Sequence, residues 1–150
     1  MLHLALAAGV AGVSVMPARA DEGASAEAAR EATHAGAELV IRSLSLLGVR
    51  YRFGGNSPDT GLDCSGLVRH VYQGAIGLVL PRRAEEISRK GERVTLDQLR
   101  AGDLVFFNTL RRAFSHVGVY IGDNRFVHAP SAGGRVRVES IDTRYWLKRF

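Results

Sequence analysis

The sequence predicts an α+β domain in which N-terminal helices pack on a small antiparallel β-sheet. The first half of the chain places apolar residues at three- and four-residue steps, which is the spacing of one helix face. The second half contains short β-rich runs separated by Gly, Asn and Asp, as in a strand meander. The chain has 150 residues, 46% of them hydrophobic, which suits one domain with its own core.

The first 20 residues have the features of a secretory signal peptide. An apolar stretch from Leu4 to Met16 precedes Pro17 and the small-x-small pattern of residues 18–20. We therefore expect cleavage near Ala20 and a secreted or periplasmic mature chain; the alternative is an N-terminal core helix. No later apolar run reaches the about 18 residues of a membrane span, so no transmembrane segment is expected after signal removal.

Three helices are expected after residue 20, over Ala24–Leu47, Cys64–Gln73 and Arg83–Lys90. The apolar face of the first is expected to consist of Ala37, Val40, Leu44 and Leu47. Gly48 and Gly91 are suitable terminators of the first and third helices, and Asp63 is placed to cap the second.

Four strands are expected, over Leu104–Phe107, Val117–Ile121, Phe126–Ala129 and Val136–Glu139. Residues 122–124 and 131–134 have the composition of hairpin turns, and residues 50–63 that of a loop. A last helical turn is expected within Asp142–Arg149.

Cys64 is the only cysteine, which excludes an internal disulfide and a Cys-rich zinc site. A lone thiol is oxidisable in an exported chain, so either it has a function or it is a buried apolar side chain. The start of a helix favours its thiolate by about 0.3–1 kcal/mol. Lowering the thiol pKa from about 8.5 to about 3–4, as in a His-paired catalytic Cys, takes about 7 kcal/mol. A nearby imidazolium must therefore supply most of that energy.

His116 and His128 are the best histidine partners for this thiol. If residues 122–124 form a three-residue loop, Ile121 pairs with Arg125 and Gly118 pairs with His128. The two rings then lie on one face, diagonally across a Gly, whereas a two-residue loop would turn His128 to the other face. This geometry predicts acyl transfer with Cys64 as nucleophile, His116 as general base and His128 as its orienting partner, through a thioester hydrolysed by water.

Several motifs occur in a fixed order along the chain: Tyr51-Arg52-Phe53-Gly54-Gly55, Asp63-Cys64-Ser65-Gly66, Ser115-His116-Val117-Gly118 and Phe126-Val127-His128-Ala129-Pro130. Together they resemble the signature of the NlpC/p60 family of cell-wall cysteine peptidases. The similarity runs from about Leu39 to Phe150, which we expect to be the catalytic domain, with residues 21–38 as an N-terminal helical extension.

The resemblance implies a papain-like α+β fold and hydrolysis of peptide bonds in peptidoglycan stem peptides or cross-links. It assigns Cys64, His116 and His128 to the catalytic triad, and Tyr51 to the tyrosine beside the nucleophile that helps to hold the oxyanion.

The resemblance also implies a substrate-binding group. Asp63, Ser65 and Arg82 match positions that bind the substrate peptide in some family members. Helix capping is the alternative for Asp63, and a surface salt bridge for Arg82. Glu86 stands where relatives commonly have Gln, which leaves any amide hydrogen bond there in doubt.

The formal net charge of +5 favours an anionic partner. For an exported chain we expect peptidoglycan rather than nucleic acid, a monomer, no cofactor and no metal. Three alternatives remain open: an amidase or acyltransferase on the same fold, an inactive wall-binding domain, and a zinc site built from Cys64, His116 and His128.

Overall fold

The computed structural model describes residues 3–4, 18–109, 112–131 and 134–150. A five-stranded antiparallel sheet has the strand order β1-β4-β5-β6-β7. Its strands are β1 (His3–Leu4), β4 (Leu104–Phe107), β5 (His116–Gly122), β6 (Arg125–His128) and β7 (Arg137–Ser140). The helices are α1 (Ala18–Ser45), α2 (Cys64–Ile76), α3 (Ala84–Ser88) and α4 (Arg144–Leu147), with a 3₁₀ turn at Leu96–Gln98. The α+β fold class is confirmed.

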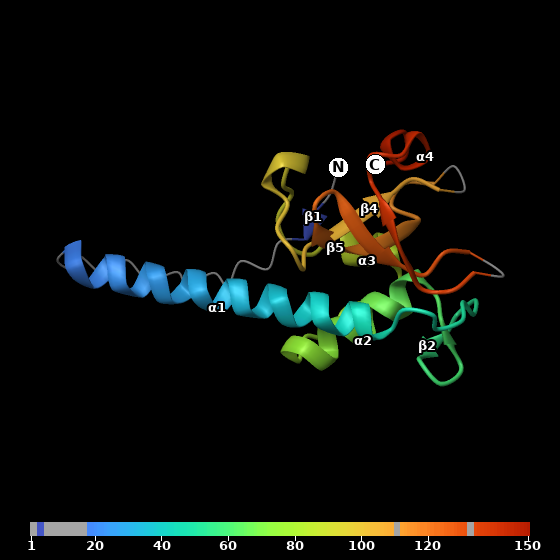
Figure 1. Cartoon of the computed structure of the whole chain (residues 1–150), viewed down its shortest axis with the longest axis horizontal. Helices are drawn as coiled ribbons and strands as arrows, with labels where there is room; N and C mark the ends of the chain where they lie inside the picture. Colours follow the sequence, from blue (N-terminus) through green and yellow to red (C-terminus); the bar gives the residue numbers. More distant parts are fainter. Residues whose placement is uncertain (1–2, 5–17, 110–111, 132–133) are drawn as a thin grey trace.

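The sheet is covered on both faces, so the domain has three layers (Figure 1). Alternation along β4 sends Leu104 and Phe106 toward α1 and α2, and Val105 and Phe107 toward α4. All four side chains are buried. The central strands are thus fixed by packing from both sides, which holds side chains at their ends in defined positions.

The buried face of α1 differs from the one that the sequence predicts. Leu39 and Leu46 are in the core, whereas Leu44 and Leu47 are 38% and 45% exposed. The correct face consists of Gly36, Leu39, Ser43 and Leu46. The predicted set, Ala37, Val40, Leu44 and Leu47, is wrong by one position.

A close backbone approach explains this rotation of α1. A Cβ added at Gly36 would lie 2.5 Å from the carbonyl oxygen of Ala101, and one added at Gly102 would lie 2.9 Å from Cα of Gly36. The helix therefore turns its smallest residue toward the loop before β4. The Ser43 hydroxyl, buried by the same rotation, donates to its own helix at the Val40 carbonyl, 2.8 Å away.

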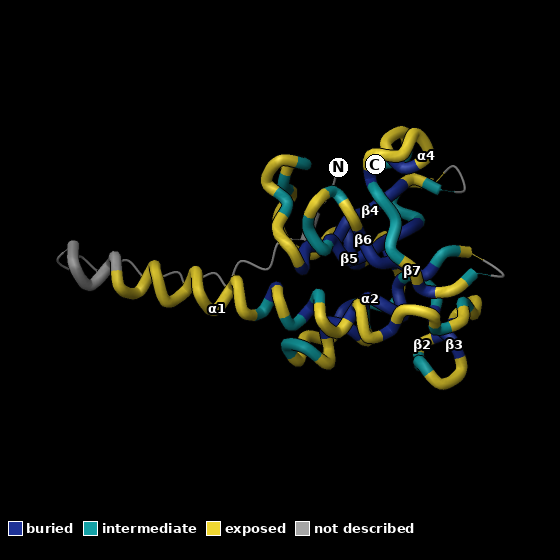
Figure 2. Tube along the Cα trace, viewed as in Figure 1, coloured by how far each residue is buried: buried dark blue, intermediate teal, exposed yellow. Residues whose placement is uncertain are grey.

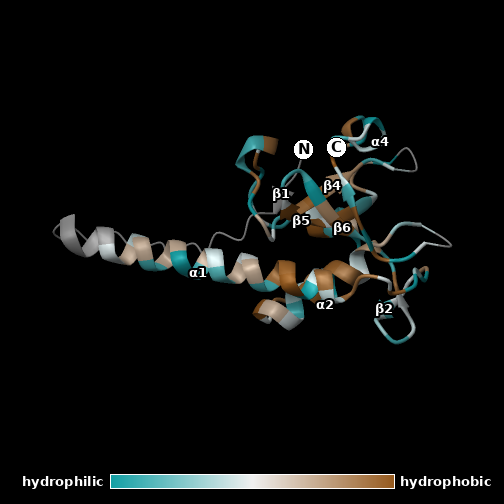
Figure 3. Cartoon of the chain, viewed as in Figure 1, coloured by the Kyte–Doolittle hydropathy of each residue, from teal (hydrophilic) through white to brown (hydrophobic). Residues whose placement is uncertain are grey.

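The first part of α1 projects from the domain, and residues 23–34 are exposed (Figure 2). The hydropathy colouring changes along the helix, from mixed on this projecting part to apolar where α1 meets the sheet (Figure 3). Residues 5–17 of the predicted signal peptide lie outside the described residues, and residues 18–20 begin α1. Among the described residues, no helix combines the length and apolarity needed to cross a membrane.

The β5–β6 hairpin has the predicted pairing at the histidines but a different turn. Val119 pairs with Val127 and Tyr120 with Phe126, which continues to the expected alignment of Gly118 with His128. The loop is not three residues long, because Gly122 pairs with Arg125. Asp123 and Asn124 form the turn, with φ values of 51° and 55°. An irregularity between Tyr120 and Gly122 adds one residue to β5 and so restores the face of His128.

The other predicted helices and strands are present, most with shifted ends, whereas the 3₁₀ turn at Leu96–Gln98 and strand β1, which lies within the predicted signal peptide, were not expected. Asp63 caps α2, accepting from the Gly66 N–H at 2.7 Å, and Gly77 ends that helix with a φ of 69°. Within the expected loop of residues 50–63, a short β pair forms from β2 (Asn56–Ser57) and β3 (Gly61–Leu62). This pair, which the sequence analysis did not predict, supports the segment leading to the start of α2.

The close approach at Gly36 predicts opposite effects of one substitution at two positions of α1. Gly36→Ala should lower the free energy of unfolding by about 1–3 kcal/mol, because the added methyl group collides with a backbone carbonyl. Gly23→Ala should raise it by up to about 1 kcal/mol, since a Cβ there meets no described atom within 4 Å. Urea denaturation of both variants checks this, and stabilisation by both would contradict the packing.

Candidate active site

Cys64 is the first residue of α2 and packs against the sheet at β5. The backbone N–H groups of Val117, Ser65 and Cys64 itself are near enough to its sulfur to lower the pKa of the thiol. Val117 directly follows His116, so the thiol meets the sheet beside the predicted general base. These N–H groups are the unpaired donors of a helix start together with one strand amide, and they can stabilise negative charge.

Burial nevertheless dominates the ionisation of the thiol. It raises the pKa of Cys64 to about 11, the charge of Asp63 acts in the same direction, and the three backbone donors only partly oppose this shift. The result is the reverse of the expected lowering to about 3–4. In the resting chain the thiol is therefore protonated at neutral pH, because burial destabilises the thiolate more than the three N–H groups stabilise it.

His116 and His128 form a hydrogen-bonded pair. Nε2 of His116 lies 2.8 Å from Nδ1 of His128, with the rings nearly perpendicular at 89° and their centroids 5.0 Å apart. Gly118 makes this contact possible, since a Cβ there would lie 3.3 Å from Cβ of His128 and closer still to Phe126 and Val127. The expectation that the two rings meet across this Gly is confirmed.

Both rings are neutral at pH 7. Burial lowers the pKa of His116 to about 3, and the neighbouring charge of His128 adds to that effect. Burial likewise lowers the pKa of His128 to about 4, although Glu139 raises it and thus opposes part of the shift. The site at rest therefore contains a neutral thiol and two neutral imidazoles.

Glu139 and Trp146 belong to the same group of side chains, and the sequence analysis missed both. Glu139 Oε2 lies 2.5 Å from Nε2 of His128, and the Trp146 ring stacks on His116 with centroids 5.5 Å apart and an interplanar angle of 19°. The pairing of His128 with Arg137 on β7 places Glu139 two residues further on the same face. Extending the predicted register from β6 to β7 could have found the carboxylate.

The predicted substrate-binding residues surround the nucleophile. Arg82 forms a two-pronged contact with Asp63, at 2.7 and 3.1 Å, and donates to the Ser65 hydroxyl at 2.6 Å. The alternative stated for each residue is thus present: Asp63 caps α2, and Arg82 forms a salt bridge, with Asp63 as its partner. Tyr51 is bridged to Leu62, and burial and the charges of Cys64 and Asp63 raise the pKa of its hydroxyl.

Other polar residues lie outside this group. His34, His70 and Glu86 are exposed. An open hollow of about 740 Å³ between α3 and residues 112–114 is lined by none of the predicted site residues. Within the described part of the chain, no three or more His, Cys, Asp and Glu side chains are grouped to hold a metal ion.

The two buried rings predict acid sensitivity of the fold. Because their folded-state pKa values lie below the about 6.5 of an unfolded histidine, the unfolded chain binds more protons in that interval. The free energy of unfolding should be fully present above about pH 6.5 and fall toward pH 4, by up to about 1.4 kcal/mol per pH unit and ring. Urea titrations across this range should show a shallower slope for His128→Asn. The exposed control His70→Asn should keep the slope, and equal slopes in all three proteins would contradict the assignment.

Comparisons with known proteins agree with this architecture. The murein DD-endopeptidase MepS/murein LD-carboxypeptidase of Escherichia coli is 47% identical over 106 residues, 69% of this chain and 53% of that protein. The gamma-DL-glutamyl hydrolase of Bacillus subtilis is 42% identical over 112 residues, 74% of this chain and 27% of that protein. The chain thus spans between a quarter and about half of the length of these curated relatives.

Solved structures and a family model identify the fold family. The NlpC/p60 domain of the peptidoglycan hydrolase SagA superposes with a TM-score of 0.67 at 30% identity, over 77% of this chain and 94% of that one. A family protein from Bacillus cereus superposes with a TM-score of 0.69 at 31% identity, over 75% and 37%. These neighbours share the papain-like α+β fold. Since the family model matches residues 48–150, most of the sequence, the chain belongs to the NlpC/P60 family.

Proposed function

We propose that this chain is an exported cysteine endopeptidase that hydrolyses peptide bonds in peptidoglycan stem peptides or their cross-links. One observation carries the proposal: Cys64 packs against the core cluster that contains Val117 of β5, and the residue before Val117, His116, forms a buried hydrogen-bonded pair with His128. The family membership and the hydrolase names of the relatives support the substrate class.

In the proposed reaction His116 is the general base. Its Nε2 is engaged with His128, so Nδ1 is the nitrogen that takes the thiol proton. The sulfur attacks the carbonyl carbon of the scissile amide, and the C–N bond breaks as the imidazolium returns the proton to the leaving amine. Water then attacks the thioester carbonyl as His116 accepts its proton, the C–S bond breaks, and His116 returns the proton to the sulfur as the acid product leaves.

The groups around Cys64 supply the remaining functions. The backbone N–H of Cys64 and the Tyr51 hydroxyl are the proposed donors to the oxyanion. The cluster of Asp63, Ser65 and Arg82 is proposed to bind the substrate peptide beside the nucleophile, since the Arg82 and Asp63 side chains remain 36% and 15% exposed and the buried Ser65 hydroxyl holds the guanidinium in place.

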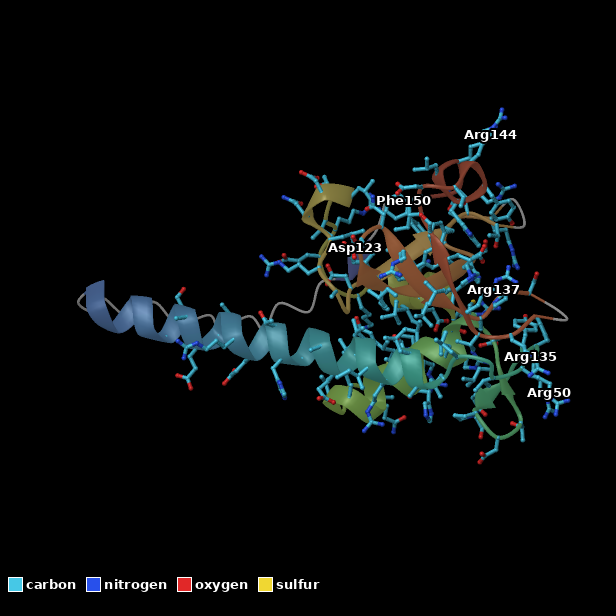
Figure 4. The ribbon with its side chains drawn as sticks, viewed as in Figure 1. Arg50, Asp123, Arg135, Arg137, Arg144 and Phe150 are labelled. Atoms are coloured by element: carbon cyan, nitrogen blue, oxygen red, sulfur yellow. The ribbon has the colours of Figure 1, made fainter. Side chains whose placement is uncertain are left out.

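The positive charge of the surface supports an anionic wall polymer as the partner. We propose that the enzyme acts as a monomer. Three exposed arginines, Arg50, Arg135 and Arg137, lie along one side of the domain, away from the projecting end of α1 (Figure 4). A basic surface of this kind attracts an anionic polymer at long range. We place the enzyme in the periplasm or outside the cell, after removal of a signal peptide near Ala20.

The proposal predicts that Cys64→Ser abolishes muropeptide release from purified peptidoglycan. A serine hydroxyl is a far weaker acid than a thiol, so His116 cannot activate it in this site. His116→Ala should have a comparable effect, whereas the exposed control His70→Ala should retain wild-type turnover. Mass spectrometry of the digest provides the measurement.

The same digest distinguishes the alternatives. Cut stem peptides support the endopeptidase, whereas freed glycan strands or acylated products would indicate an amidase or an acyltransferase. Binding to sacculi without any product would indicate a wall-binding domain. Undiminished cleavage by Cys64→Ser would remove the cysteine mechanism altogether.

Export makes a separate prediction. Expression of residues 1–150 in a bacterial host should give a mature protein that begins at or near Asp21, because the small-x-small site ends at Ala20. Intact-mass measurement of the periplasmic fraction checks this, and Ala18→Asp with Ala20→Asp should block processing. A periplasmic protein that retains Met1 would contradict cleavage.

A further inference from the structure

Glu139 on β7 ends a chain of hydrogen bonds that begins at His116. Its Oε2 lies 2.5 Å from Nε2 of His128, whose Nδ1 in turn lies 2.8 Å from Nε2 of His116. His128 is fully buried, while the Glu139 side chain is 26% exposed. The chain of contacts thus connects a strand-edge carboxylate to the proposed general base through a ring with no access to water.

Other side chains fix the carboxylate in this place. Nε of Arg137, which Figure 4 labels on the same strand, donates to Oε2 at 3.1 Å. The Trp146 side chain from α4 also hydrogen-bonds to Glu139, while its ring stacks on His116. Burial would raise the pKa of Glu139, but the hydrogen bonds from Trp146, Arg137 and His128, together with the His128 charge, hold it below its ordinary value. Glu139 is therefore an ionised acceptor at neutral pH.

We propose that Glu139 is a positioning residue that selects the reactive tautomer of both histidines. This inference rests on the proposed function and names a further residue for the same site. A carboxylate only accepts hydrogen bonds, so Nε2 of His128 must carry the hydrogen. Neutral His128 then has a lone pair at Nδ1, which accepts the hydrogen on Nε2 of His116. Neutral His116 is left with its lone pair at Nδ1, the nitrogen that must take the Cys64 proton.

Without Glu139 the direction of the hydrogen bond between the two rings is no longer fixed. The reversed arrangement, with hydrogen on Nδ1 of His128 and lone pair on Nε2 of His116, makes the same bond between the rings. It places hydrogen on Nδ1 of His116, and that form cannot accept the thiol proton. When His116 does take the proton, both its nitrogens carry hydrogen, and Glu139 holds His128 in the orientation that accepts from this cation.

Nuclear magnetic resonance can test the tautomer directly. In ¹⁵N-histidine-labelled protein, long-range ¹H–¹⁵N correlations should show His128 and His116 protonated at Nε2. In Glu139→Ala both rings should show averaged or reversed patterns. Glu139→Gln should keep the native pattern, because Arg137 and His128 both donate to the oxygen that the amide retains. The exposed carboxylate variant Glu31→Gln is the matched control.

Kinetics provide the second readout. The kcat of Glu139→Ala on peptidoglycan should fall about 10- to 100-fold with little change in KM, because general-base catalysis is typically worth about 10²–10⁴-fold and only part depends on the tautomer. Alkylation of Cys64 by iodoacetamide at neutral pH should slow in the same variant. Glu139→Gln should restore both rates, and Glu31→Gln should match the wild type.

The outcomes separate this inference from the proposed function. Native tautomers in Glu139→Ala together with unchanged alkylation would overturn the positioning role. Equal loss of activity in the Ala and Gln variants, in step with equal loss of thermal stability, would also overturn it in favour of a structural carboxylate. If the wild type failed to cleave peptidoglycan while tautomers and alkylation responded as expected, the positioning role would stand and the proposed substrate would fall.

Discussion

The register of β5 against β6 is the constraint on which the rest of the site depends. Only when Gly118 lies opposite His128 can the ring of His128 reach His116, since any side chain at 118 would occupy that space. Packing on both faces of the sheet holds this register. The irregularity between Tyr120 and Gly122 also sets this register, because it compensates for a two-residue turn that would otherwise place His128 on the opposite face of the sheet.

Burial decides the electrostatics of the site. The thiol and both imidazoles are shifted toward their neutral forms, in opposite directions, by withdrawal from water. Neutral groups depend on hydrogen-bond direction more than on charge attraction to be ready for proton transfer. The orientation of the two rings therefore depends on Glu139 of β7, which hydrogen-bonds to His128, and on Trp146 of α4, which stacks on His116.

Local features of the fold were predictable because they depend on neighbours in the sequence. Asp63 directly before the helical spacing predicted the cap of α2, and a short β-rich run predicted β4 over the range that the structure has. The face of α1 was not predictable in this way. Its apolar residues satisfy helical spacing in two adjacent settings, and contact of Gly36 with the backbone of Ala101 and Gly102 selects between them.

By itself the sequence determined the fold class and the lone thiol at a helix start. These follow from period, composition and helix capping, which are properties of short segments. The meeting of the two histidines was predicted from a three-residue loop, and only the irregularity in β5 restores it for the two-residue turn that the structure has. Only the tertiary structure decided the ionisation of the thiol and the membership of Glu139 and Trp146 in the histidine group. Desolvation and contacts between β6, β7 and α4 depend on how distant segments pack, and no local pattern of residues encodes that packing.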